Sequence, residues 1–505
     1  MAVRLLSRLL VLVLIVACVL FLEASLGAQA TNSTQPIQTA LQAKDFAQAL
    51  QLTEAELSKS PRDAKLWMFK GIALTGLGQQ KPALEAYDKA LAISPDYLPA
   101  LEGAAGLEYG AGNAQAVTHL NRILQHLPND PTSHAMLAAI AYKGHDCATA
   151  AKHFAQSTQL IASQPAALSE YGTCLMDLGR ATEAASVFGQ IVTQFPDNTQ
   201  ARYNLAVAQL AAHQGKDALE TLQPMLNAKD PDPDVLDLAS SAYEDQGDTP
   251  KAVTLLRQAV VADPKKTKYY LDFATLSFNH QSFQVGIDMM NVGLNEAPKA
   301  ASLYVARGIL YVQLGQYDKG EEDFQTAMRL DPAQASGAVA QGMAQVQQSN
   351  LDQALATVQS QLQTHPKDAF LYYMRAQIII QKGATPGTPE FRDAIAAALR
   401  STQLNPDFVL SRDVLGGLYL KSGQLTLAIE QCHAALRGNP SDQEAIYHLI
   451  QALRQSGKGS KTEMADLVKR LADLRRESRE QEASSNKYKL YEAKPAENKE
   501  AIPQQ

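Results

Sequence analysis

The chain has 505 residues, of which 46% are hydrophobic and 19% are charged, and its formal net charge is −7. This composition is typical of a folded globular protein and excludes a chain that is disordered throughout. An acidic balance without clusters of Lys and Arg gives no electrostatic basis for binding phosphates, so it also excludes nucleic acid as a partner.

Residues 1–30 are predicted to be a secretory signal peptide. Arg4 and Arg8 precede an apolar run from Leu9 to Leu22, and the cleavage motif Ala28-Gln29-Ala30 follows it. The run is short for a membrane span. Two alternatives stay open, an uncleaved N-terminal anchor and a lipoprotein signal with Ile15-Val16-Ala17-Cys18 as its lipobox. In each case we expect the bulk of the protein to be exported, as a periplasmic or secreted protein that the two alternatives would tether to the membrane through the N-terminal segment. After cleavage of the signal peptide we expect no transmembrane domain in the mature chain.

The next segment, residues 31–457, repeats with a period of 34 residues. A proline that follows an amphipathic stretch recurs at Pro61, Pro95, Pro128, Pro196, Pro264, Pro298, Pro332, Pro366, Pro406 and Pro440. Most of these prolines are 34 residues apart, two gaps span two periods, and one gap contains an insertion at residues 384–390. Such a period indicates stacked repeats rather than several independent domains.

The same residue types recur at the same positions of each period. One period contains Trp67, Gly71, Leu74, Gly78, Ala83, Tyr87, Ala90 and Pro95, and a later one contains Tyr304, Gly308, Tyr311, Gly315, Gly320, Phe324, Ala327 and Pro332. The first three residues of each set lie on one face of a helix, where the small one lets a second helix approach closely. The next glycine supplies the left-handed conformation that ends the first helix.

This pattern resembles the tetratricopeptide repeat, a helix–turn–helix unit of 34 residues. The resemblance covers residues 31–457 as about twelve units. It implies an all-α fold, a right-handed superhelical α-solenoid in which each pair buries its apolar faces against its neighbours. Trp67, the only tryptophan, stands at the first large position, so we expect its ring between helices and not on a binding surface.

The carboxyl end of the chain changes character after the last repeat. Leu467, Leu471 and Leu474 are spaced as on one face of a helix. Residues 458–482 are therefore predicted to form a helix that caps the last repeat with a polar outer face. Residues 483–505 have the composition of a disordered polar tail.

The sequence contains no motif for catalysis, cofactor binding or metal binding. A phosphate-binding glycine loop, H-E-x-x-H and G-x-S-x-G are all missing, so we expect neither an enzyme nor a cofactor. His145, Cys147 and His153 share no metal-ligand spacing, so no metal site is expected. Cys147, Cys174 and Cys432 are expected to be buried free thiols. The alternative is a bridge between Cys147 and Cys174, which fall on neighbouring helices.

The resemblance also implies where a ligand would bind. In this family ligand contacts come mainly from the second, fifth, ninth, twelfth and thirteenth residues of each first helix. The family's clamp for a peptide carboxylate is absent, because only Asn204 matches it in phase. The corresponding positions of the later units instead carry apolar side chains: Leu271, Phe278, Val305, Ile309, Val312, Val339, Met343, Val346, Tyr373 and Ile380, flanked by Gln313, Gln347, Gln377 and Gln381.

These side chains predict an apolar groove with an amide rim, suited to a hydrophobic or amphipathic segment of a partner protein. The competing interpretation is that neighbouring helices bury several of them. Tyr373 is the one tyrosine placed to stack on a sugar ring.

Exported proteins of this family commonly serve the bacterial cell envelope. The resemblance therefore implies a non-catalytic protein-binding scaffold of the envelope or periplasm, working in an envelope complex. One alternative is a polysaccharide-binding or export accessory protein. Another is a regulatory module of a glycosyltransferase-type enzyme, although the long catalytic half of such enzymes is not in this sequence.

Overall fold

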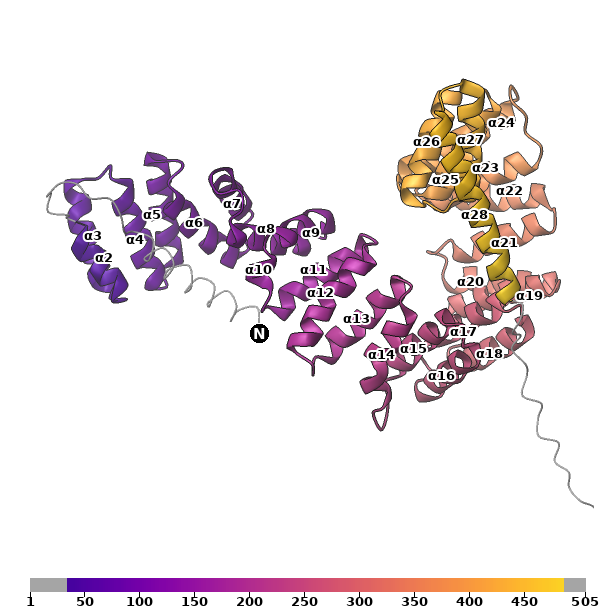
Figure 1. The fold of residues 1–505 in the computed structure, drawn as a ribbon, viewed down its shortest axis with the longest axis horizontal. Coiled ribbons are helices and arrows are strands. Elements are labelled where there is room, and N and C mark those ends of the chain that lie inside the picture. The colour runs from indigo at the N-terminus through magenta and orange to yellow at the C-terminus, as the bar shows by residue number, and fades with distance from the viewer. Residues whose placement is uncertain (1–33, 486–505) are drawn as a thin grey trace, which may run out of the picture. The chain divides into compact units, whose positions relative to one another are not determined.

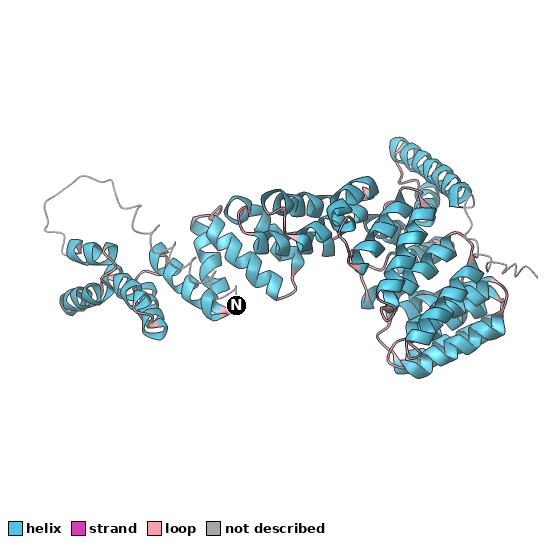
Figure 2. Ribbon diagram, turned by 90° about the horizontal axis from the view of Figure 1, so that it is seen from below, coloured by secondary structure: helices cyan, strands magenta, loops and turns pink. Residues whose placement is uncertain are grey.

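The computed structural model describes residues 34–485. The predicted signal peptide lies outside these residues, and so does the chain beyond residue 485. The described residues form helices and no strand, which confirms the all-α fold class (Figure 2). No helix among them combines the length and the apolar character that crossing a membrane requires.

The described residues divide into two compact units, with the boundary between Ala228 and Lys229, and the helix pairs below are those of the described residues. The first unit contains six helix pairs (Figure 1): α2 (Gln35–Gln42) with α3 (Phe46–Lys59), α4 (Ala64–Gly76) with α5 (Gln80–Ile93), α6 (Leu98–Ala111) with α7 (Gln115–His126), α8 (Pro131–Lys143) with α9 (Cys147–Gln156) and the short α10 (Thr158–Ile161), α11 (Pro165–Asp177) with α12 (Ala181–Gln194), and α13 (Thr199–Ala211) with α14 (Gly215–Leu226).

The second unit contains seven helix pairs: α15 (Pro233–Asp245) with α16 (Thr249–Ala262), α17 (Thr267–Asn279) with α18 (Phe283–Glu296), α19 (Ala301–Gln313) with α20 (Tyr317–Leu330), α21 (Ser336–Gln347) with α22 (Leu351–Thr364), α23 (Ala369–Gln381) with α24 (Pro389–Leu404), α25 (Val409–Lys421) with α26 (Leu425–Gly438), and α27 (Gln443–Ser456) with α28 (Lys461–Ser485). Within each unit the first helix packs on its own second helix, which in turn packs on the next pair. This succession is the stacked arrangement of a solenoid.

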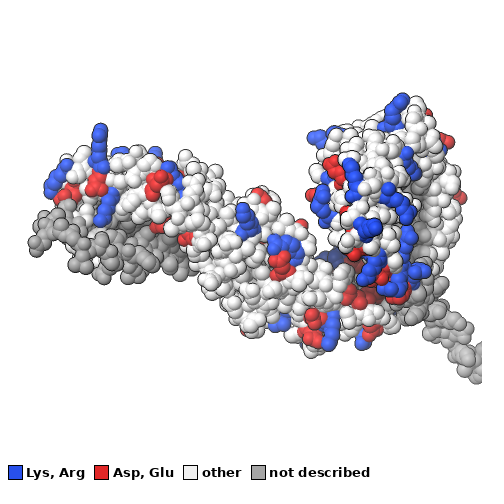
Figure 3. Space-filling view, turned by 45° about the horizontal axis from the view of Figure 1, so that its top comes forward, with Lys and Arg blue, Asp and Glu red and all other residues white. Residues whose placement is uncertain are grey.

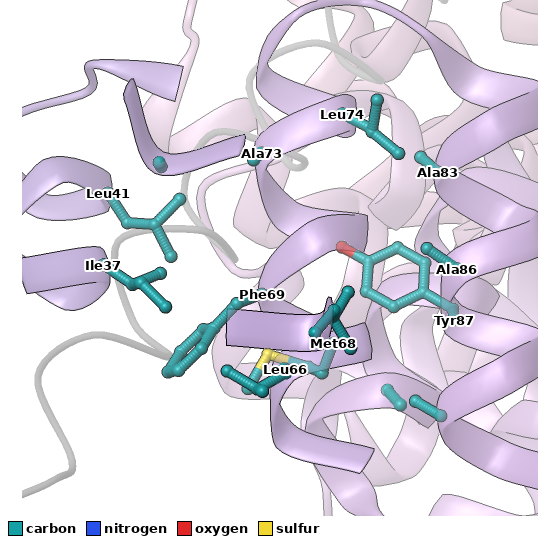
Figure 4. Packing of buried hydrophobic residues seen from close by; sticks show 14 of the residues in the cluster. Ile37, Leu41, Leu66, Met68, Phe69, Ala73, Leu74, Ala83, Ala86 and Tyr87 are labelled. Carbon is teal, nitrogen blue, oxygen red and sulfur yellow. The ribbon is translucent and has the colours of Figure 1, made fainter. Parts of the chain in front are cut away.

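A close contact between a glycine of the first helix and a ring of the second holds several helix pairs together, whereas Gly416 of α25 meets the Cys432 sulfur of α26. A Cβ atom placed on Gly71 of α4 would lie 2.5 Å from the ring of Tyr87 on α5, and one on Gly308 would lie 2.5 Å from the ring of Phe324. Figure 4 shows Tyr87 pointing from α5 toward α4, among the other buried side chains of this cluster. The glycine is therefore needed because the ring occupies the space of a side chain.

The turn between the two helices requires a left-handed residue in every repeat. Gly78 and Gly315 have φ angles of 76° and 71°. Five repeats hold the same conformation without glycine, at Lys44, His145, His213, Gln281 and Ser349, with φ between 52° and 62°. Such a conformation costs a non-glycine residue roughly 1–2 kcal/mol. Helix packing on either side therefore imposes the turn even where the local sequence opposes it.

Trp67 lies between a helix core and solvent. Its ring is partly buried and packs against the first core cluster, and its Nε1–H donates a hydrogen bond to the Pro61 carbonyl at 2.9 Å. The Lys89 ammonium lies 4.4 Å from the ring centroid. The predicted packing role is confirmed, but the ring is not fully enclosed.

The bond made by Trp67 recurs along the chain. In six repeats the residue at this position meets the carbonyl of the proline six residues before it: Trp67 with Pro61, His134 with Pro128, Arg202 with Pro196, Tyr270 with Pro264, Tyr304 with Pro298 and Arg412 with Pro406. In these six repeats the side chain is long and ends in a donor, so Arg and His can replace an aromatic residue there, whereas Leu101 and Ile446 fill the same position as buried apolar residues. The bond satisfies a carbonyl left free where the preceding helix ends.

At the end of the second unit, α28 packs on α27. Leu467 and Leu474 are partly buried and Leu471 is 8% exposed, against Ile446 and Ile450 of α27. An Arg470 guanidinium donates to the Pro440 carbonyl, the same kind of acceptor that the first helices use. The apolar side of α27 is therefore covered by α28.

Cys147 and Cys174 form a disulfide, so the expectation of three free thiols is wrong. Cys147 begins α9 and Cys174 lies on α11, with their Cα atoms 4.8 Å apart, a separation that permits a bridge. The disulfide ties the second helix of one pair, which is interrupted between α9 and α10, to the first helix of the next pair, α11. The interrupted pair lies between Pro128 and Pro196, where no proline stands in phase with the repeat. Cys432 is the free buried thiol among the described residues, and burial raises its pKa to about 12.

Two histidines of the first unit share one hydrogen bond. His134 Nδ1 lies 2.8 Å from His153 Nδ1, and His134 Nε2 lies 2.9 Å from the Pro128 carbonyl. A carbonyl only accepts, so Nε2 of His134 carries the proton and its Nδ1 accepts from His153. Burial and the neighbouring His134 lower the pKa of His153.

This pair should make the first unit less stable in weak acid. The folded state lowers the pKa of His153, so the neutral histidine contributes to the free energy of unfolding above the unfolded pKa of about 6.5. This contribution is lost as the pH falls below that value, because the unfolded state then binds the proton more readily. We expect the free energy of unfolding in urea to decrease from pH 7.5 to pH 5.5. His153→Gln keeps a donor for His134 and should flatten this dependence. An unchanged slope in the variant would contradict the assignment.

Two Gly→Ala substitutions in the first unit should have opposite effects. A Cβ atom on Gly172 would lie 2.6 Å from the Phe188 ring, whereas one on the exposed Gly110 would meet nothing within 4 Å. Overpacking by Gly172→Ala should cost about 1–3 kcal/mol. Gly110→Ala should stabilise by about 0.5–1 kcal/mol, because alanine is the better helix former. Thermal unfolding of both variants measures this, and destabilisation by both would argue against the ring contact.

Candidate protein-binding surface

The predicted groove residues lie on the first helices of the second unit, from α17 to α23. Phe278, Ile309 and Met343 are 41%, 37% and 56% exposed. Six others are partly buried: Leu271, Val305, Val339, Val346, Tyr373 and Ile380. We call these nine side chains the apolar face.

Val312 does not belong to the apolar face. It is only 4% exposed and packs in a core cluster with Phe324, Ala340 and Ala344. Its helix α19 is flanked by α20 and α21, and both approach the side on which Val312 stands. The prediction for this residue is therefore wrong, because burial by the next repeat cannot be read from its position in its own helix.

The partly buried members of the apolar face are anchored in the core beneath it. Val339 and Val346 of α21 pack against the same cluster as Tyr373 of α23. Tyr373 and Ile380 also pack against the following cluster around Ala376. Since α17 contacts α19 and α19 contacts α21, the apolar side chains stand on a connected row of helices.

Tyr373 is part of a cluster of three aromatic rings. Its centroid lies 5.4 Å from that of Phe370 and 5.4 Å from that of Phe408, and the two phenylalanines are 5.8 Å apart. Phe408 immediately precedes α25, where Leu410 is 46% exposed. Sequence reasoning missed Phe370 and Phe408. Phe370 is the second residue of α23, one of the contact positions of the repeat, so it could have been predicted. Phe408 precedes α25, where the spacing within a helix predicts nothing.

A shallow hollow adjoins the aromatic cluster. It has a volume of about 440 Å³ and is open to solvent, and its walls include Val339, Phe370, His365 and Asp368. Asp368 already accepts hydrogen bonds from the backbone N–H groups of Phe370 and Leu371, at 2.8 and 3.2 Å. The hollow therefore offers apolar contact more than free polar groups.

The predicted amide rim is present in part. Gln347 and Gln381 are exposed and Gln313 is partly buried. Gln377 donates from Nε2 to the Tyr373 hydroxyl at 3.4 Å. These amides can donate and accept hydrogen bonds with a peptide backbone.

Two arginines, on α19 and α23, are turned toward the second helices. The Arg307 guanidinium pairs with Asp323 of α20, at 2.8 Å from Nε and 2.7 Å from Nη2, and this carboxylate raises the arginine's pKa. Arg375 pairs through Nη2 alone with Asp393 of α24, at 2.8 Å. Figure 3 shows charges of both signs scattered over a face with large uncharged areas. The apolar face is thus not interrupted by these arginines.

The described residues hold no group of three side chains fit to bind a metal ion. His145, Cys147 and His153 are not brought together, since Cys147 is bridged to Cys174 and His153 contacts His134.

Comparison with known proteins gives the following matches. Models of the tetratricopeptide repeat match residues 37–97, 135–199, 175–242 and 301–334. The wheat (Triticum aestivum) Hsp70-Hsp90 organizing protein is 26% identical over 243 residues, 45% of this chain and 40% of that protein. Tetratricopeptide repeat protein 33 of Xenopus laevis is 34% identical over 91 residues, 18% of this chain and 33% of that protein. The chain thus spans less than half the length of these relatives.

Two solved structures also align with the chain. The crystal structure of yeast Tom70 aligns over 90% of this chain and 93% of its own, with 17% identity and a TM-score of 0.42. Naa15/Naa10 bound to HypK-THB aligns over 90% and 78%, with 14% identity and a TM-score of 0.37.

The family models match four stretches, two of which overlap, and together they cover residues 37–97, 135–242 and 301–334. Their helix pairs share the small-residue contact, the left-handed turn and the proline at the end of the second helix. The chain therefore contains tetratricopeptide repeats.

Proposed function

We propose that this protein is a non-catalytic scaffold that binds an apolar segment of a partner protein on the apolar face. The observation that carries the proposal is the exposure of Ile309 and Met343 on neighbouring helices whose contact positions bear no charge. Exposed apolar side chains on a connected surface are typical of protein interaction sites. Among the relatives, the wheat protein is named for organizing two other proteins.

We further propose that the protein works outside the cytoplasm, in the bacterial envelope or periplasm and in a complex with envelope proteins. The predicted signal peptide supports this location. The disulfide between Cys147 and Cys174 supports it independently, because such bonds persist in oxidising compartments.

Polysaccharide binding is less well supported. Sugar rings stack on exposed aromatic faces, whereas Tyr373 is partly buried beside Phe370 and Phe408. Its surface offers a contact for an apolar side chain rather than a free platform.

Capture of envelope proteins by the immobilised chain tests the proposed function. Met343→Asp should reduce capture about tenfold or more, because burying a side chain of this size contributes about 1.5–3 kcal/mol. Val292→Asp is the matched control, since Val292 is 48% exposed on α18, a second helix. It should leave capture unchanged. Equal capture by all three proteins, or binding of glycan without any protein, would contradict the proposal.

A further inference from the structure

The contact positions of the second unit separate into an acidic part and an uncharged part. On α15 four of the five positions used for ligand contact carry acids: Asp234, Asp237, Glu244 and Asp245. On α19, α21 and α23 none of these positions carries a charge. The helix between them, α17, presents Lys268 together with Leu271 and Phe278 of the apolar face. One end of the apolar face is therefore bordered by carboxylates.

The carboxylates of α15 are held against α17 by two lysines. The Lys266 ammonium lies 2.6 Å from Asp234, whose Oδ1 also accepts from the Tyr269 hydroxyl at 2.8 Å. The Lys268 ammonium bonds to Asp237 and lies 2.6 Å from Asp272. These contacts hold Asp234 and Asp237 of α15 next to the first turn of α17. The acidic contact positions of α15 therefore adjoin the apolar face.

The lysines do not neutralise this cluster. Three carboxylates, those of Asp234, Asp237 and Asp272, share the two lysines. Glu244 is bonded instead through Oε1 to His280 at 2.7 Å. The Asp237 side chain is 3% exposed, and its Oδ1 has no hydrogen-bond partner, nor has Oε2 of Glu244. A buried carboxylate oxygen without a donor is costly, and a cationic group beside it lowers that cost.

We propose that the partner segment carries uncharged apolar side chains that lie over α17 to α23 and at least one Arg or Lys at the end that reaches α15. This proposal rests on the proposed function and specifies the chemistry of its ligand. Charge complementarity favours a cationic end on the partner segment, because an acidic end would be repelled by a cluster in which carboxylates outnumber lysines. The uncharged contact positions of α19, α21 and α23 select an apolar remainder, because a charge buried there would find no counter-ion.

Three fluorescent peptides test the proposal with the full chain. The first has two arginines followed by a leucine-rich uncharged stretch, the second has two glutamates in place of the arginines, and the third has serines in place of the leucines. In fluorescence anisotropy we expect the first to bind at least about tenfold more tightly than either other peptide. Its binding should weaken with rising salt, since the acids that face solvent are screened.

Substitutions in the chain separate the two parts of the ligand. Asp272→Asn removes a partly exposed acid and leaves Lys268 bonded to Asp237, so the arginine peptide should lose roughly threefold to tenfold in affinity and the glutamate peptide none. Asp288→Asn is the matched control, an exposed acid on the second helix α18. It should change neither affinity. Met343→Asp should weaken both leucine-rich peptides.

The outcomes distinguish this inference from the proposed function. Equal binding of the arginine and glutamate peptides, both sensitive to Met343→Asp, would overturn the cationic end and leave the apolar face as the binding site. Absence of binding by any leucine-rich peptide, or binding unaffected by Met343→Asp, would overturn both. An equal loss in Asp272→Asn and Asp288→Asn would show a general effect of net charge and contradict the local contact.

Discussion

The close approach of the two helices of a pair, which a small residue on the first helix permits, is the constraint on which the repeats depend. Tyr87 against Gly71 and Phe324 against Gly308 bring two helices closer than a side chain at the glycine would allow. Each pair also has an apolar side that faces the next pair, and the following pair covers it. Because every pair relies on the next, the same small residue recurs with the period of the chain.

A second recurring interaction ties successive pairs together. The donor at the first large position reaches back to the proline carbonyl at the end of the preceding helix, as Trp67 does to Pro61 and Tyr304 does to Pro298. The sequence pattern shows the position as large, and the structure shows that in six repeats the polar end of the side chain is used as well. Arg202 and Arg412, which depart from the aromatic pattern, keep that function through their guanidinium groups.

Much of the fold could be predicted because it follows from periodicity. The all-α class and the helix pairs depend on local spacing, which the sequence displays directly. The left-handed turns at Gln281 and Ser349 could not be read locally, since helix packing rather than residue type imposes them. The Cys147–Cys174 disulfide could not be decided from the sequence for a related reason, because it depends on how one interrupted helix pair packs against the next.

The candidate site was predictable to the extent that it follows the repeat phase. Phase placed Ile309 and Met343 on a face, and the structure leaves both exposed. It also placed Val312 there, which the following pair buries. Phe408 joins Tyr373 from a turn, where no helical phase applies. The acids of α15 hold contact positions too, but their importance appears only when Lys268 and Asp272 are seen beside them.

The central claim is that a partner segment lies on the first helices of the second unit and not on the second helices. Photo-crosslinking measures this directly, with a benzophenone amino acid replacing Met343 in one protein and Val292 in another, each mixed with the arginine–leucine peptide. The account predicts a covalent adduct at position 343 and none at position 292. Adducts of equal yield at both positions, or at position 292 alone, would contradict it.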